Sequence, residues 1–161
     1  MNEIIVIAHN IRSTHNIGSI IRTCEGFGVK KIIISGYSPY PKLKNDTRLP
    51  HISEKLTKQI TKASLGAEKM IDIEFQDFPD FKQLKNEGYI IVGLEQNDKS
   101  LPINEFKTKN KIALLLGEEV HGIDKNIINN CDCLVEIPMK GKKESFNVSV
   151  ATGIALYQIT I

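Results

Sequence analysis

Four short runs of apolar residues constrain the fold of this 161-residue chain more than any other feature. They are rich in Val, Ile and Leu, with little polar alternation, and cover residues 3–8, 31–35, 89–94 and 111–116. Such runs are typical of parallel strands that are buried on both faces. Segments with helical spacing or turn residues separate the runs. The sequence therefore predicts one α/β domain, residues 1–161, built around a parallel sheet.

The remaining elements are predicted from apolar spacing and from residues that can cap helices. The first helix begins near Asn16 and has one apolar face, formed by Ile17, Ile20, Ile21 and Cys24. Three more helices are expected, over residues 53–63 with Ser53 as the N-cap, 78–86, and 124–129 with Asp124 as the cap. Two shorter strands are expected over residues 71–75 and 134–137.

The end of the chain combines a strand, a polar loop and a helix start. Pro138 ends the strand, and Ser145 is a candidate N-cap for the final helix. That helix has apolar residues at helical spacing, namely Phe146, Val150, Ile154 and Tyr157. A strand, an exposed loop and a helix N-terminus form the ligand site of many α/β proteins. An ordinary strand-to-helix junction explains this segment equally well.

Composition excludes several classes of protein. No run approaches the about 18 apolar residues of a membrane span, and the N-terminus lacks the basic start of a signal peptide. The three cysteines have no metal-ligand spacing, because Cys131 and Cys133 are too close for a zinc knuckle and no second pair exists. We therefore expect reduced thiols in a cytoplasmic protein without a structural metal.

Charge is distributed unevenly along the chain. Residues 30–69 carry nine Lys and Arg against three Asp and Glu, whereas residues 70–136 carry seven against thirteen. The basic segment could face phosphates, and its candidate nucleic-acid-binding residues are Lys42, Lys44 and Arg48. A solvated basic surface is an equally good interpretation of the charge alone.

The usual signatures of nucleotide hydrolysis and of nucleophilic catalysis are missing. The chain has no G-x-x-x-x-G-K-[ST] sequence and no G-x-G-x-x-G spacing. Its histidines are dispersed among polar residues, which argues against a hydrolase triad. Arg22 is either a surface residue on an Ile-rich helix or, at the rim of the sheet, a bidentate ligand for a phosphate.

Three motifs, however, resemble those of the SpoU (TrmH-like) RNA 2′-O-methyltransferases of the SPOUT superfamily. The first is Asn16-x-Gly18-x-x-x-Arg22-Thr23, and the second runs from Leu116 through Gly117 and Glu118 to Ile123. The third is Ile137-Pro-Met-x-Gly-x-x-x-Ser145-Phe-Asn-Val-Ser-Val-Ala-Thr-Gly153. They occur in the family's order and cover essentially the whole chain. Phe146 departs from the pattern, because a leucine is usual there.

This resemblance implies a parallel sheet with a C-terminal trefoil knot, a homodimer and S-adenosylmethionine as cofactor. The implied cofactor-binding residues are Leu94, Leu116, Gly117, Ile137, Met139, Ser145, Phe146 and Asn147. The implied catalytic set is Asn16, Arg22, Glu118, Ser145 and Asn147. We expect the dimer to form through the first and last helices, where two groups of residues offer apolar surface: Ile17, Ile20 and Ile21, and Ile154, Tyr157 and Ile161.

The resemblance also implies the reaction, transfer of a methyl group to a ribose 2′-hydroxyl. A guanidinium has a pKa above ~12 and is an implausible base, so we interpret Arg22 as a clamp on the adjacent phosphate. Three polar residues would orient Arg22 and the cofactor, namely Asn16, Ser145 and Asn147. No metal is needed. Because the chain starts directly at its first strand, tRNA is favoured over rRNA. A catalytically silent RNA-binding protein of the same fold and an unrelated nucleotide-sensing α/β module are the alternatives.

Overall fold

The computed structural model describes residues 2–107 and 109–161. Its strands form one seven-stranded sheet. Every strand pairing in it is parallel, and the strand order is β3-β2-β1-β6-β4-β7-β5. The strands are β1 (Glu3–His9), β2 (Lys31–Ser35), β3 (Asp72–Gln76), β4 (Ile90–Leu94), β5 (Leu101–Pro102), β6 (Lys111–Leu116) and β7 (Cys133–Glu136). The predicted parallel α/β architecture is confirmed.

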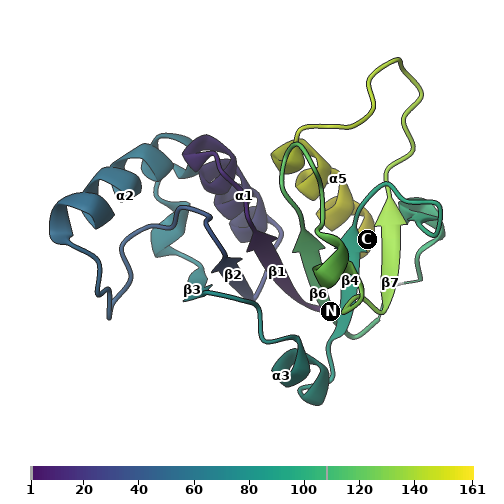
Figure 1. The fold of residues 1–161 in the computed structure, drawn as a ribbon, viewed down its shortest axis with the longest axis horizontal. Helices are drawn as coiled ribbons and strands as arrows, with labels where there is room; N and C mark the ends of the chain where they lie inside the picture. Colours follow the sequence, from purple (N-terminus) through teal and green to yellow (C-terminus); the bar gives the residue numbers. More distant parts are fainter. Residues whose placement is uncertain (1, 108) are drawn as a thin grey trace.

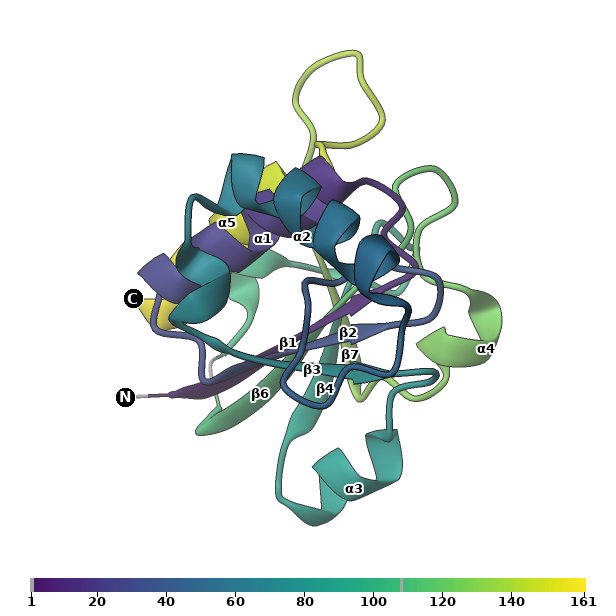
Figure 2. The ribbon, with the colours of Figure 1, turned by 90° about the vertical axis from the view of Figure 1, so that its left-hand side faces the viewer.

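Helices cover both faces of the sheet. Figure 2 shows α1 (Thr14–Gly26), α2 (Pro50–Ser64) and α5 (Val148–Thr160) on one face. The shorter helices α3 (Phe81–Asn86) and α4 (Lys125–Ile128) lie on the opposite face. Two 3₁₀ helices, η1 (Ala67–Lys69) and η2 (Ile103–Glu105), lie in connections. The strands β1, β2, β6 and β7 run in the same direction in Figure 1, so their carboxyl ends share one edge.

The core consists of two apolar clusters, one on each side of the sheet. Along β1, Ile4, Val6 and Ala8 belong to the cluster that contains buried apolar residues of α1, α2 and α5. Ile5 and Ile7 belong to the other cluster, which contains residues of α3 and α4. Both faces of the strand are therefore buried, which explains why its sequence is continuously apolar.

The strand predictions match the structure more closely than the helix boundaries do. The predicted β2 and β6 have the observed bounds, and Asp124 caps α4 by accepting a hydrogen bond from the Asn126 N–H. The predicted cap Ser53 is wrong, because α2 begins at Pro50 and Ser53 is buried in its first turn. Pro is suited to that first position since its missing N–H has no helical partner there. The two-residue strand β5 was not predicted.

The final helix differs from the prediction in its cap and in its buried face. Asn147, not Ser145, is the N-cap, and its side chain accepts from the Ser149 N–H. The side chains that α5 buries are Thr152, Ala155, Leu156 and Ile159. The predicted apolar face is instead largely exposed: Phe146 is 41%, Val150 50% and Tyr157 60% exposed. In residues 2–107 and 109–161, no helix is long and apolar enough to cross a membrane.

Candidate functional site

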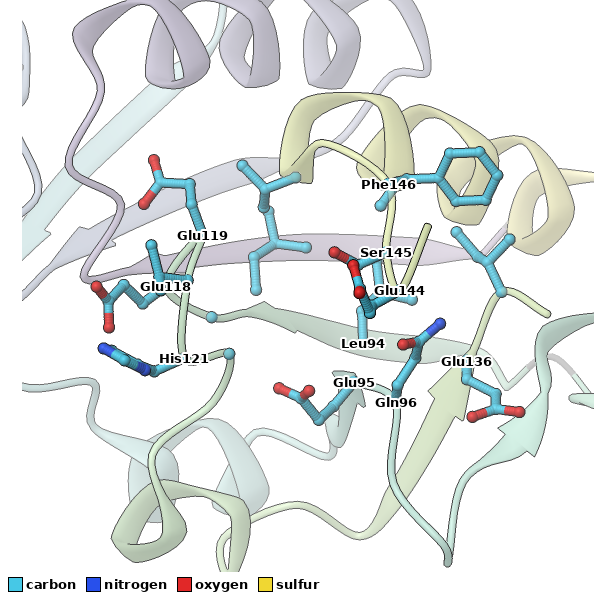
Figure 3. Close-up of a pocket in the computed structure, with 17 residues that line it drawn as sticks. Leu94, Glu95, Gln96, Glu118, Glu119, His121, Glu136, Glu144, Ser145 and Phe146 are labelled. Atoms are coloured by element: carbon cyan, nitrogen blue, oxygen red, sulfur yellow. The ribbon is translucent and has the colours of Figure 1, made fainter. Parts of the chain in front are cut away.

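A pocket of about 290 Å³ lies at the carboxyl ends of β4, β6 and β7. Figure 3 shows its walls, which come from the residues after these strands and from the start of α5. Seven apolar residues line it: Leu94, Leu116, Val120, Ile137, Phe146, Val148 and Ala151. Five carboxylates surround them: Glu95, Glu118, Glu119, Glu136 and Glu144. The pocket therefore combines an apolar interior with a negative rim.

The structure brings most of the predicted cofactor residues to this pocket. Leu94, Leu116, Gly117, Ile137, Ser145 and Phe146 line it, and so does the predicted catalytic residue Glu118. Met139 and Asn147 follow the same strand but are not among the lining residues. Ten further lining residues were not predicted from the sequence: Glu95, Gln96, Glu119, Val120, His121, Gly122, Glu136, Glu144, Val148 and Ala151.

The loop after β6 forms a tight turn at the pocket. Glu118 and Gly122 form an antiparallel bridge with two backbone hydrogen bonds, of 3.0 and 2.9 Å. Gly117 must be glycine here, because a Cβ would lie 2.4 Å from both the carbonyl carbon of Gly122 and the nitrogen of Ile123. The turn is tied to β4 by Glu95, whose carboxylate accepts a hydrogen bond from the Ile123 N–H. Burial raises the pKa of Glu95, and this hydrogen bond opposes the rise.

Next to the pocket, three polar side chains form a connected network. Asn16 is 8% exposed and donates its amide to Glu119 Oε1 at 3.0 Å. Asn147 donates to Asn16 Oδ1 at 3.2 Å. Glu119 also accepts the backbone N–H groups of Arg12 and Ser13, at 3.2 and 3.3 Å. This network joins the starts of α1 and α5 to the loop after β6.

Glu119, which the sequence analysis did not select, is therefore the glutamate of the polar network. Burial raises its pKa, but the hydrogen bonds from Asn16, Arg12 and Ser13 outweigh burial and lower it. Glu118 has a different partner: its Oε1 is buried and lies 2.9 Å from Arg12 Nη2. The sequence does not show which of the two adjacent glutamates faces Asn16, because that depends on how the turn orients each side chain.

The structure does not bring Arg22 into the pocket. Its side chain is exposed on α1, six residues beyond Asn16. Within the described part of the chain, it has no hydrogen bond or ion pair at its guanidinium. The group is therefore available to a ligand outside the protein, and its role stays a prediction.

The three candidate RNA-binding residues differ in their surroundings. Lys42 and Lys44 are exposed. Arg48, in contrast, pairs with Asp46, donates to the carbonyls of Tyr40 and Pro41, and stacks on the Tyr40 ring with its Cζ 3.5 Å from the ring centre. Its guanidinium thus organises the loop before α2. No cluster of three or more potential metal ligands occurs in residues 2–107 and 109–161.

Comparison with known proteins agrees with this geometry. The sequence profile of the SpoU rRNA Methylase family matches residues 3–157, nearly the whole chain. The chain belongs to this family.

Among family relatives, the tRNA (guanosine(18)-2′-O)-methyltransferase of Aquifex aeolicus is 34% identical over 97% of this chain and 68% of its own length. The enzyme of the same name from Mus musculus is 28% identical over 99% of this chain. This chain covers only 9% of the mouse protein and 10% of the tRNA (guanosine(18)-2′-O)-methyltransferase of Saccharomyces cerevisiae. The crystal structure of the Aquifex aeolicus TrmH/SpoU tRNA modifying enzyme superposes with a TM-score of 0.79 at 30% identity, covering 99% of this chain and 75% of that one.

Proposed function

We propose that this protein transfers a methyl group from S-adenosylmethionine to a ribose 2′-hydroxyl of RNA, with tRNA favoured over rRNA. The observation that carries the proposal is the pocket at the carboxyl ends of β4, β6 and β7, with the Asn16–Glu119–Asn147 network beside it. Family membership and the two tRNA (guanosine-2′-O)-methyltransferase relatives support the same reaction.

The pocket has the chemical character that adenosylmethionine requires. Its apolar wall, which includes Leu116, Ile137 and Phe146, suits the flat adenine ring. The carboxylates at its rim suit a ligand with a sulfonium and an ammonium group, because both are cations. The residues present therefore fit this cofactor.

Bound adenosylmethionine would supply an electrophilic methyl group, which the 2′-oxygen attacks in line. The protein's task is mainly to align the two reactants. We infer that Asn16, Glu119 and Asn147 fix the rim of the pocket through their mutual hydrogen bonds. Arg22 clamps the phosphate next to the reacting ribose, and this phosphate assists removal of the hydroxyl proton. Lys42 and Lys44, which do not line the pocket, bind phosphates of the RNA backbone.

We further propose a homodimer formed through α5. The expectation that α1 also takes part is wrong for Ile17, Ile20 and Ile21. These side chains are buried within the protomer, at 0–1% exposure. The exposed face of α5 supports the dimer: Tyr157 is 60% and Ile161 79% exposed, close to Val150 on the same side of the helix. A monomeric mass in light scattering at micromolar concentration would contradict this.

The C-terminal trefoil knot also belongs to this proposal. It is supported by the resemblance and by the strand order, in which β7 pairs with β4 while β6 lies between β4 and β1. An electron-density map traced from Leu94 to Asn147 decides the threading. We place the protein in the cytoplasm, which its free cysteines Cys24, Cys131 and Cys133 support.

The placement of the cofactor can be tested from the helix side of the pocket. Ala151→Leu extends a side chain from α5 into the cavity, and we expect adenosylmethionine binding to be lost in calorimetry. Ala151→Ser is the matched control, because a small side chain at the same position leaves the cavity open. A bulky residue at Gly117 is a poorer test, since its side chain would collide with the backbone of the turn.

The reaction itself is tested by transfer of labelled methyl groups to unmodified RNA, followed by mapping of alkali-resistant positions. We expect 2′-O-methylation that depends on the protein. Binding of adenosylmethionine and RNA without transfer would contradict the proposal and would favour the catalytically silent alternative.

A further inference from the structure

Beside the pocket, an arginine and an exposed tyrosine lie together at the carboxyl ends of β1 and β2. Tyr37 is 54% exposed and the Arg12 side chain 66%. The Arg12 Cζ lies over the Tyr37 ring, 5.7 Å from its centre. Neither residue belongs to the family motifs identified in the sequence, and neither lines the pocket.

The backbone beneath Tyr37 is held in a defined turn. Asn10, which has a φ of 56°, accepts the Tyr37 N–H on its side-chain oxygen at 3.1 Å. Gly36, also at a positive φ of 66°, donates its N–H to the Asp77 carbonyl at 3.2 Å. The Ser38 hydroxyl accepts the Ile11 N–H at 2.8 Å. The ring is thus presented to solvent by a fixed turn that spans the ends of two strands.

A second arginine–tyrosine pair in the same protein shows what a structural pair looks like. Arg48 lies 3.5 Å from the centre of the Tyr40 ring, and its guanidinium is used by Asp46 and two carbonyls. The other face of Tyr40 is stacked on Phe75, with 4.1 Å between ring centres. That pair is closed on both sides. In the Arg12–Tyr37 pair, by contrast, both residues are more than half exposed.

Arg12 also connects Tyr37 to the pocket. Its Nη2 lies 2.9 Å from Glu118 Oε1, and Glu118 lines the pocket. Its backbone N–H donates to Glu119. A single side chain therefore separates the open ring from the pocket wall. Phe78 is another exposed aromatic on this edge, but its ring packs against His9 and Phe81. Among residues 2–107 and 109–161, no arginine or lysine lies over it.

We propose that Tyr37, together with Arg12, stacks on an unpaired base of the RNA next to the nucleotide that is methylated. An accessible aromatic ring next to a guanidinium is the usual platform for single-stranded RNA, since every base has a π-face and every nucleotide a phosphate. This inference rests on the proposed function, because it takes the RNA substrate from it. It makes Tyr37 a residue for RNA binding rather than for the chemical step.

The sequence contains no tryptophan, which allows a direct test. Tyr37→Trp introduces a single fluorophore on the platform, and stacking on a base should quench it as unmodified tRNA is added. Met70→Trp is the matched control, because Met70 is 73% exposed just before β3, at the opposite edge of the sheet. Quenching at position 37 alone supports the proposal. Equal quenching at both positions, or none at position 37, overturns it.

Turnover separates this inference from the proposed function. In Tyr37→Ala we expect the KM for RNA to rise about 10-fold or more, the scale of one lost base stack, with adenosylmethionine affinity and saturated kcat kept. Tyr37→Phe should retain the wild-type KM, because the ring remains. An unchanged KM in Tyr37→Ala overturns the platform and leaves the proposed function standing. If the wild type transfers no methyl group but Tyr37→Trp is quenched selectively, the proposed function fails, and Tyr37 is an RNA-stacking residue of a binding protein rather than a neighbour of a methylated nucleotide.

Discussion

Asn147 donates a hydrogen bond from its side-chain amide to the side-chain oxygen of Asn16, at 3.2 Å and across 131 positions of the chain. The same Asn147 caps α5, and the same Asn16 donates to Glu119. One bond therefore fixes the first turn of α1 relative to the first turn of α5. Because the pocket lies beside both turns, we expect its shape to depend on this contact.

Two substitutions at position 147 separate capping from this contact. Asn147→Asp keeps a good N-cap but cannot donate to Asn16, so methyl transfer should fall about 10-fold or more with little loss of stability. Asn147→Ala should lose the same activity and about 1 kcal/mol of stability as well. Urea unfolding and single-turnover transfer measure the two effects. Full activity in Asn147→Asp would show that the contact is only structural.

The two adjacent glutamates provide a matched pair. Three N–H donors meet the two oxygens of Glu119, whereas Glu118 meets Arg12. Glu119→Gln removes one acceptor oxygen and should lower transfer by about 10-fold, because the network loses its order. Glu118→Gln should have the smaller effect. The opposite ranking of the two rates would restore the assignment first made from the sequence.

Much of the fold could be predicted because the strands are buried on both faces, which leaves continuous apolar runs. The packing face of α5 could not be predicted in this way. Both sides of that helix are apolar, so spacing alone does not show which side packs, and Val150 and Tyr157 lie on the exposed one. The strand β5 was missed because it has only two residues, one of them Pro102.

The site was predicted to the level of its loops but not of individual side chains. The parallel sheet predicted that the loops after β6 and β7 share an edge. The family resemblance named Gly117, Ile137 and Phe146 within them, and all three line the pocket. It did not distinguish Glu118 from Glu119, since the hydrogen-bonded turn at Glu118 and Gly122 sets where each side chain points. Arg48 was taken for an RNA contact because charge in a sequence does not show whether a partner such as Asp46 is already present.

Arg48 and Lys44 should therefore behave differently when replaced. Asp46 and Arg48 are largely buried, with side chains 4% and 17% exposed, so Arg48→Ala leaves Asp46 without its partner. We expect a loss of about 2 to 3 kcal/mol in the free energy of unfolding. Lys44→Ala should leave stability unchanged and should weaken RNA binding with a lower salt dependence. Equal stability of the two variants would contradict the structural role of Arg48.

Glu95 should make stability depend on pH. Its pKa is raised by burial, so the folded protein holds this proton more tightly than the unfolded chain. The contribution of Glu95 to stability is therefore present below the ordinary glutamate pKa of about 4.3 and is lost as pH rises through the raised value. Glu95→Gln keeps an acceptor for the Ile123 N–H without a charge. In thermal unfolding, the melting temperature of the variant should rise relative to that of the wild type between pH 4 and pH 7. A difference in melting temperature that does not change with pH would contradict this.

Arg22 distinguishes a catalyst from a binding protein. Its exposed guanidinium has no partner in residues 2–107 and 109–161. A phosphate of the RNA can therefore accept two hydrogen bonds from it at once. If this contact tightens as the 2′-oxygen approaches the methyl group, its loss should lower turnover more than binding. Arg22→Ala should then reduce single-turnover transfer by about 10²-fold, the scale of one preorganised electrostatic group, with cofactor affinity unchanged.

Arg22→Lys shows whether geometry or charge matters. A lysine restores the positive charge but not the planar fork, so we expect little recovery of the rate. Arg12→Lys is the control for replacing an arginine by lysine elsewhere, because Arg12 is also exposed but is assigned to RNA binding. Its effect should appear in the KM for RNA. A wild-type rate in Arg22→Ala at saturating protein would leave Arg22 a surface residue, and the positioning of the ribose would then have to come from the Asn16–Glu119–Asn147 network alone.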